Sequence, residues 1–237
     1  MTRQFDNPIF CALDTTDLEA AVALAHDLRG AVGGVKLGLE FFYAHGGDGY
    51  RRVAQAGLPI FLDLKLHDIP NTVAGGLRAV LPLEPAIVNV HAGGGRTMMS
   101  TAAEVVRDWD GRRPMLIGVT VLTSLDADDL AETGVASDPA AQADRLAALA
   151  RAAGLDGVVC SSHEIARLRA ALGPDFKLVV PGIRPAGSGV ADQKRVMTPA
   201  EAFGLGADLL VIGRPITRAA DPAAAAREIA GELAAAA

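Results

Sequence analysis

The sequence has few aromatic residues and no excess of positive charge. Aromatic side chains make up 4% of the 237 residues, which leaves little material for platforms that stack bases or sugars. Lys and Arg number 22 against 28 Asp and Glu, a formal net charge of −6. This balance argues against binding nucleic acid through broad positive charge, although a local basic cluster can still hold a small anionic ligand. Specificity is therefore expected from charged groups and the backbone.

Cysteines and long apolar runs are also scarce. Cys11 and Cys160 are the two cysteines, and each lies in a short apolar run outside any spaced ligand set, so we expect buried thiols. No stretch approaches the roughly 18 apolar residues of a membrane span, and Met1 to Pro8 has no apolar leader segment. Half of the residues are apolar, which excludes a disordered chain. We expect a cytoplasmic protein that binds neither membrane nor nucleic acid.

Short β-rich runs alternate with longer runs of helical period, the pattern of repeated βα units on a parallel sheet. Eight such pairs are predicted in a length close to the roughly 250 residues typical of a (β/α)8 TIM barrel, which favours that fold over an open doubly wound sheet. A single domain over residues 1–237 is expected, since no linker interrupts the pattern. The strands are predicted at 9–14, 34–38, 60–65, 86–91, 115–121, 157–161, 177–182 and 209–214. Two longer loops, 122–138 and 183–198, are typical of lids.

Charged residues gather at the predicted strand ends, where the active sites of such barrels lie. Because an unpaired buried charge is costly, we expect them to be paired. In the third strand, the period of two places Asp63 and Lys65 on one face. The alternating set of Lys36, Asp63, Lys65 and Asp68 would keep every member ionised. The alternative is a solvated ion pair on a surface strand.

A second group of residues follows strands seven and eight, where these barrels usually bind phosphate. Gly213 exposes backbone N–H groups, and arginine adds bidentate contacts to an anion. The alternative is that Gly213 is a turn residue and Arg214 a surface charge. The predicted members of this phosphate site are Gly182, Arg184, Gln193, Gly213 and Arg214.

The sequence contains no metal or cofactor motif such as His-Glu-x-x-His or a Walker A loop. Neither His67 nor His91, at the ends of strands three and four, is expected to act as an acid or base. The sequence thus predicts an enzyme without a metal or cofactor.

The run Asp63-Leu64-Lys65-Leu66-His67-Asp68-Ile69-Pro70-Asn71-Thr72 resembles the signature of the bacterial orotidine 5'-phosphate decarboxylases. The similarity extends over nearly the whole chain and includes Pro181-Gly182-Ile183-Arg184 and Ile212-Gly213-Arg214-Pro215-Ile216-Thr217. One departure is Val180, where many bacterial relatives have Thr. A D-x-K-x-x-D run also occurs in 3-keto-L-gulonate 6-phosphate decarboxylases, but the Ile-Pro-Asn-Thr extension and Asp192-Gln193 favour the orotidine family.

The resemblance implies cofactor-independent decarboxylation of orotidine 5'-phosphate to UMP and CO2, the last step of de novo UMP biosynthesis. It implies that Lys65 donates a proton to C6 and that Asp63 faces the substrate carboxylate. Lys36 and Asp68 complete the catalytic set. The implied substrate contacts also include Asp14 and Lys36 at the ribose, Thr123 and Ser124 at the pyrimidine, Arg184, Gln193, Gly213 and Arg214 at the phosphate, and Leu64, Leu66, His67, Pro70, Asn71 and Pro181.

In this family, residues after the third strand reach the neighbouring subunit's site. The resemblance therefore implies a homodimer in which Asp68, Ile69 and Thr72 act across the interface. Three alternatives remain: a Mg²⁺-dependent sugar-phosphate decarboxylase or epimerase, an aldolase that uses Lys65 as a Schiff-base nucleophile, and a barrel that only binds nucleotides. An inactive relative would be expected to lack at least one of the four catalytic residues, and all four are present.

Overall fold

The fold is a closed barrel of eight parallel strands in the order β1 to β8, as the alternating pattern predicts. The computed structural model describes residues 5–136, 138–185 and 197–235. All eight predicted strands are present, and most are shorter at their C-terminal ends than predicted. They are β1 (Ile9–Ala12), β2 (Gly34–Leu37), β3 (Ile60–Leu66), β4 (Ile87–His91), β5 (Met115–Val119), β6 (Gly157–Val159), β7 (Lys177–Pro181) and β8 (Leu209–Ile212).

The chain divides into two compact units, which are described in turn. Unit 1 comprises Met1–Leu64 with Val180–Ala237, and unit 2 comprises Lys65–Val179. A single domain over 1–237 therefore stays a prediction.

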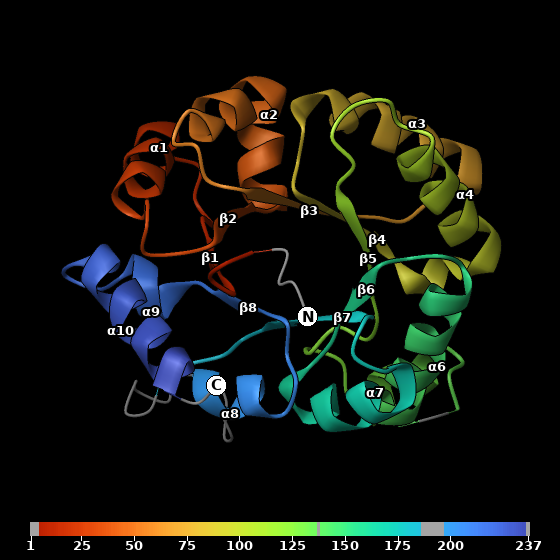
Figure 1. The fold of residues 1–237 in the computed structure, drawn as a ribbon. Coiled ribbons are helices and arrows are strands. Elements are labelled where there is room, and N and C mark those ends of the chain that lie inside the picture. The colour runs from red at the N-terminus through yellow and green to blue at the C-terminus, as the bar shows by residue number, and fades with distance from the viewer. Residues whose placement is uncertain (1–4, 137, 186–196, 236–237) are drawn as a thin grey trace. The chain divides into compact units, whose positions relative to one another are not determined.

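Unit 1 holds β1, β2 and β8, whose residues are all buried. β1 pairs with both neighbours, so that Cys11 lies opposite Val35 of β2 and Ile212 of β8. Figure 1 shows the helices of this unit outside these strands, where α1 packs on α2 and α10. The helices are α1 (Leu18–Asp27), α2 (Leu39–Ala54), α8 (Pro199–Gly204), α9 (Arg214–Thr217) and α10 (Pro222–Ala235).

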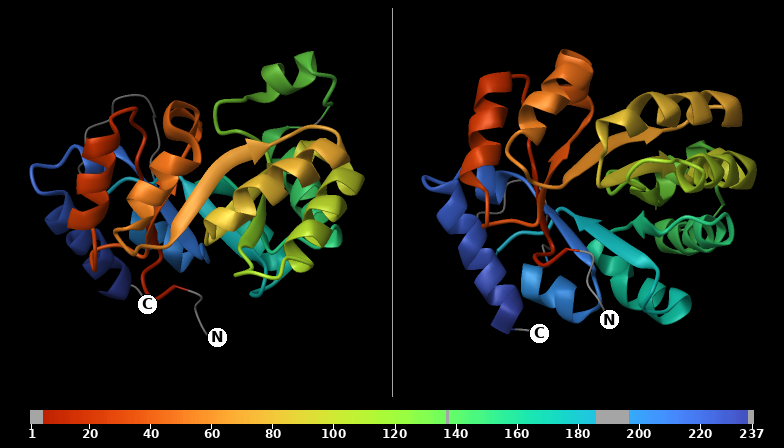
Figure 2. Two further views of the ribbon diagram at one scale, coloured as in Figure 1. Left: turned by 90° about the horizontal axis from the view of Figure 1, so that it is seen from above. Right: turned by 45° about the horizontal axis from the view of Figure 1, so that its top comes forward.

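Unit 2 holds β4, β5 and β6, which pair in parallel in sequence order. Neighbouring helices pack on one another, α3 on α4, α4 on α6 and α6 on α7, and Figures 1 and 2 show them as a row. The α-helices are α3 (Pro70–Val80), α4 (Gly95–Arg107), α5 (Ala127–Glu132), α6 (Pro139–Ala152) and α7 (Ile165–Leu172). The 3-10 helices are η1 (Leu81–Leu83), η2 (Ala92–Gly94) and η3 (Ser162–Glu164).

The segment after β5, predicted as a loop over 122–138, contains the short helix α5, so that prediction is wrong for 127–132. Asp126 caps this helix by accepting hydrogen bonds from the backbone N–H groups of Asp128 and Asp129. Leu130 then packs with Ala143 of α6 and Val121. Within unit 2, α5 stands out from the other helices (Figure 2, left). A cap and one buried leucine are thus enough to form a helix too short for periodicity to predict.

Two charged residues predicted inside strands lie beyond them. Asp14 follows the end of β1 by two residues, and Arg214 begins α9 instead of closing β8. Pro215 in the first turn of α9 explains the second correction, because proline is favoured at helix starts and cannot donate to a sheet. Within the described ranges, no helix combines the length and apolar character that crossing a membrane requires.

Candidate active site

Lys36 is the centre of a charged network in unit 1. Its Nζ atom lies 3.2 Å from Asp14 Oδ1 and 3.2 Å from Asp63 Oδ2. The side chains of Lys36 and Asp63 are buried, with 11% and 9% exposed, whereas that of Asp14 is 58% exposed. The register of β2 against β3 places Lys36 opposite Phe61. The predicted pairing of Lys36 with Asp63 is therefore present, and the burial of Asp63 is at odds with a solvated surface pair between Asp63 and Lys65.

The network keeps Lys36 charged. Burial by itself would lower the pKa of Lys36, but Asp63 and then Asp14 act in the opposite direction, and the pKa lies above its ordinary value of 10.5. Nearby in β1, burial and then the charge of Asp14 raise the pKa of the Cys11 thiol to about 12. Cys11 and Cys160 are both buried and not disulfide-bonded, as predicted from their apolar surroundings.

Gly38 leaves the space that the network occupies. A Cβ atom at this position would lie 3.1 Å from Lys36 Nζ and 3.5 Å from Asp14 Oδ1, so a side chain would crowd the ion pair. Gly38 was not among the predicted site residues. Its place directly after the strand that carries Lys36 was the available signal, because glycine at such a position often marks a close approach.

A cavity of about 340 Å³ opens beside this network. It brings together eight predicted residues of unit 1: Asp14, Lys36, Asp63, Pro181, Gly182, Arg184, Gly213 and Arg214. Gly182 has φ of 77°, a backbone conformation that favours glycine. Val180, the departure from the family pattern, is fully buried in β7. Gln193 lies outside the described residues.

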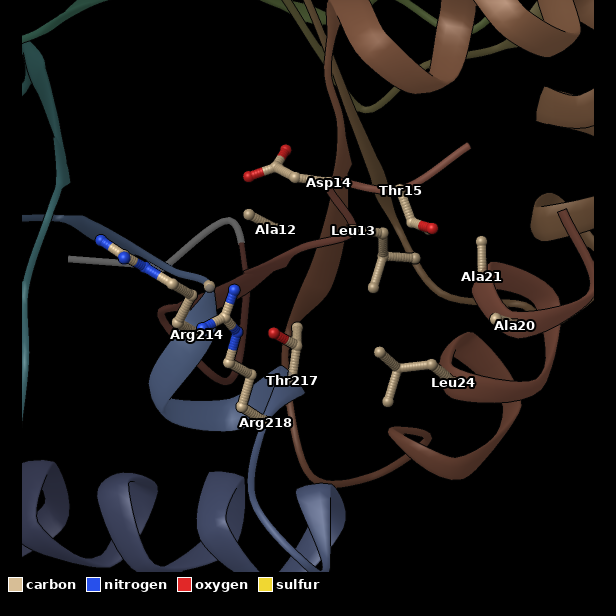
Figure 3. A pocket seen from close by; sticks show the side chains of 11 residues that line it. Ala12, Leu13, Asp14, Thr15, Ala20, Ala21, Leu24, Arg214, Thr217 and Arg218 are labelled. Atoms are coloured by element: carbon tan, nitrogen blue, oxygen red, sulfur yellow. The ribbon is translucent and has the colours of Figure 1, made fainter. Parts of the chain in front are cut away.

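A second cavity of unit 1 shares Asp14 and Arg214 with the first but has a different character. Leu13 and Leu24 point toward each other across it, and the guanidinium of Arg214 is directed away from them (Figure 3). Arg218, one turn after Arg214, lines this second cavity and not the first. The charged cavity is therefore the better candidate for an anionic substrate.

Lys65, the first residue of unit 2, has an unusual backbone conformation. Its φ is 49°, in the left-handed region that costs a residue other than glycine about 1–3 kcal/mol. The Lys65 backbone N–H donates a hydrogen bond of 2.8 Å to Oδ1 of Asn89, which is 1% exposed in β4. Strict strand alternation stops at Lys65, so a common face for Asp63 and Lys65 stays a prediction. Asn89 was missed because a polar residue in an apolar strand gave no motif.

The other predicted residues of unit 2 either follow Lys65 in the chain or lie beyond the end of β5. The ring of His67 stacks on that of His91 with centroids 5.3 Å apart. Asp68 accepts a hydrogen bond of 2.7 Å from the Ile69 backbone N–H just before α3. The predicted positions of unit 2 that are exposed or partly exposed also include Leu66, Pro70, Asn71, Thr72, Thr123 and Ser124, and Leu64, the last residue of the first segment of unit 1, is partly exposed.

The barrel and its charged strand ends define the class of (β/α)8 enzymes, whose active sites lie at the C-terminal ends of the strands. Across the part of the chain that the structure describes, no three His, Cys, Asp or Glu side chains cluster as a metal ion would require.

Comparison with known proteins gives the family. The family model described as "Orotidine 5'-phosphate decarboxylase / HUMPS family" matches residues 7–229, and the chain belongs to this family. Relatives named orotidine 5'-phosphate decarboxylase include those of Rhodospirillum rubrum, 58% identical with 98% of this chain and 96% of the relative covered, and Sphingopyxis alaskensis, 56% identical with 96% and 99% covered. The crystal structure of orotidine 5'-phosphate decarboxylase from Lactobacillus acidophilus is 39% identical, with a TM-score of 0.86 and coverage of 96% and 99%.

Proposed function

We propose that this chain decarboxylates orotidine 5'-phosphate to UMP and CO2 without a cofactor, as the last step of de novo pyrimidine biosynthesis. The observation that carries the proposal is the buried Lys36 ammonium between Asp14 and Asp63, in a cavity that Arg184 and Arg214 also line. The names of relatives that are more than half identical to this chain support the same reaction.

The substrate is a nucleotide monophosphate, and the charged cavity of unit 1 suits it. Arg184 and Arg214 supply guanidinium groups for the 5'-phosphate, with Gly213 beside them. Asp14 and Lys36 take the ribose hydroxyls, since one accepts and the other donates hydrogen bonds. Thr123 and Ser124 meet the pyrimidine edge in this proposal, and Gln193 contributes to phosphate binding.

Loss of CO2 from C6 leaves an electron pair in the plane of the ring, where the π-system cannot delocalise it. The developing carbanion therefore needs electrostatic stabilisation. In our proposal the Lys65 ammonium faces C6, stabilises the negative charge and then donates the proton that completes UMP. The electron pair of the broken C–C bond thus ends in the new C6–H bond.

Asp63 faces the substrate carboxylate in this proposal, so the ground state is disfavoured by repulsion between like charges, as a secondary effect. Asp63 keeps the buried Lys36 charged. Binding energy from the phosphate, far from C6, offsets the cost of bringing these charges together.

We further propose that the enzyme is a cytoplasmic homodimer in which Asp68, Ile69 and Thr72 reach the partner's site. Ile69, immediately before α3, has 67% of its surface exposed. Burial of this apolar side chain against a second subunit would favour association.

The test is an assay of the purified protein with orotidine 5'-phosphate, following the loss of its absorbance and the formation of UMP. We expect turnover without any added cofactor and unchanged turnover with a chelator. No UMP under these conditions would overturn the proposal. Turnover of a sugar phosphate that a chelator abolishes would favour the sugar-phosphate reaction, and trapping of Lys65 by borohydride with substrate would favour the aldolase.

A further inference from the structure

We infer that Asn89 is a positioning residue for Lys65, acting through the backbone of the lysine and not on the substrate. The inference rests on the proposed function, in which Lys65 is the proton donor. Asn89 was not predicted as a site residue, and it lies in the middle of β4, with its backbone in register with Ile117 of β5.

The hydrogen bond between Lys65 and Asn89 has a side-chain oxygen as its acceptor, where a regular strand would use a backbone carbonyl. In a regular parallel ladder, a strand N–H bonds a carbonyl of the neighbouring strand. The N–H of Lys65 instead donates to the side-chain oxygen of Asn89 at 2.8 Å. The bond is held away from bulk water because Asn89 is 1% exposed, and a buried amide bond of this kind is strongly directional.

This bond acts where the backbone of Lys65 most needs support. A lysine with φ of 49° is in a sparsely populated conformation, which persists only when its surroundings determine it. The same φ sets the direction in which the Lys65 side chain leaves the strand. Asn89 therefore fixes the origin and direction of the ammonium-bearing chain, and preorganised placement of this kind is what catalysis by a fixed charge requires.

The chain offers a matched control in the same unit. Asp156 Oδ2 accepts a hydrogen bond of 2.8 Å from the backbone N–H of Leu116 in β5. Leu116 has an ordinary strand backbone and no proposed role in catalysis. Removing either acceptor leaves a strand N–H without that bond, but only the Asn89 bond involves Lys65.

The test compares Asn89→Leu, Asn89→Asp and Asp156→Ala by steady-state kinetics and thermal unfolding. We expect Asn89→Leu to lower kcat about 10²-fold, the scale of a misplaced catalytic group, with little change in KM. Asn89→Asp keeps an oxygen acceptor and is expected to retain more of kcat than Asn89→Leu. Asp156→Ala is expected to lower the unfolding temperature and leave kcat unchanged. The inference is overturned if Asn89→Leu only lowers stability, or if Asn89→Asp loses kcat as fully.

A second measurement needs no variant and no substrate. Amide hydrogen exchange of the wild-type protein, read by NMR, should show strong protection of the Lys65 N–H, because the bond and its burial both slow exchange. Rapid exchange at Lys65 would overturn the inference even if the enzyme is active. Protection at Lys65 in a protein that forms no UMP would instead count against the proposed function alone.

Discussion

The ammonium of Lys36 and the carboxylate of Asp63 lie 3.2 Å apart, with both side chains buried. Burying each charge costs desolvation free energy, because each group must leave water. Their proximity makes the two residues a unit: the charge of each depends on the other, and the proposed ribose contact and the proposed carboxylate contact are joined by one ion pair.

Replacing Lys36 by methionine should therefore destabilise the fold strongly. The Lys36→Met change removes the cation beside the buried Asp63, and breaking a buried pair by removing one partner costs about 3–5 kcal/mol. Urea unfolding measures the loss. The matched control is Arg52→Met, which breaks an exposed pair with Glu19 at 2.9 Å and should cost about 0–1 kcal/mol. Equal losses for the two variants would contradict the burial argument.

Lys65→Ala should separate binding from chemistry. We expect the variant to bind UMP through the phosphate and ribose contacts, while turnover falls about 10⁴-fold or more through loss of the proton donor and its charge. Calorimetry with UMP and a UMP-formation assay measure the two effects. Turnover close to that of the wild type would remove Lys65 from its proposed role.

Arg214 at the start of α9 and Arg218 just beyond its end provide a paired test of phosphate binding. Arg214→Ala should raise KM about 10–100-fold, because hydrogen bonds to charged groups contribute about 1.5–3 kcal/mol. Arg218→Ala removes the same charge four residues further along the chain, at the second cavity, between whose walls Leu13 and Leu24 face each other (Figure 3). This change should leave KM nearly unchanged. If both variants raise KM alike, net charge and not the location of Arg214 is responsible.

Mixing two inactive chains tests the proposed homodimer. A hybrid of Lys65→Ala and Asp68→Ala subunits would contain one site built from intact residues and one that lacks both. Random exchange of equal amounts should thus restore about a quarter of all sites. Subunit exchange is verified with differently tagged chains. Verified exchange without any recovery of activity would refute the shared site.

Burial of Cys11 should make the fold less stable at alkaline pH. Its pKa is raised from the ordinary 9.0 to about 12, so the unfolded chain loses the thiol proton first. The stability that depends on the protonated thiol is complete below pH 9.0 and is lost as pH rises toward about 12. Urea unfolding across this range should show a shallower decline for Cys11→Ala. A decline identical to that of the wild type would mean that Cys11 does not contribute.

The fold was predictable because each strand is a short apolar run between helices of clear period. What failed was local: the prediction carried Asp14 and Arg214 into strands and treated α5 as a loop. The C-terminal ends of the strands are hard to predict from sequence. The alternation of apolar and polar residues continues past the last residue that is hydrogen-bonded to a neighbouring strand. α5 depends on Asp126 and on the packing of Leu130 against α6, which is tertiary information.

The charged part of the site was predictable for a different reason. A lysine and an aspartate inside apolar strands are expected to pair, because an unpaired buried charge is costly. Lys36 and Asp63 form such an ion pair. Nothing in the sequence shows that Lys65 adopts a left-handed backbone, since no glycine marks it, and its support from Asn89 is a contact between residues far apart in the chain. Gly38 was visible, but its role depends on where Lys36 Nζ and Asp14 come to lie.

The two buried cysteines have a practical consequence. Reagents that alkylate or conjugate thiols act on the accessible thiolate, and Cys11 and Cys160 are each at most 1% exposed. In its folded state, the natural chain should therefore react very little with maleimide dyes and thiol-specific spin labels. A single cysteine introduced on the surface, for example at the exposed Tyr43 of α2, would then carry the only reporter, without removing either native thiol.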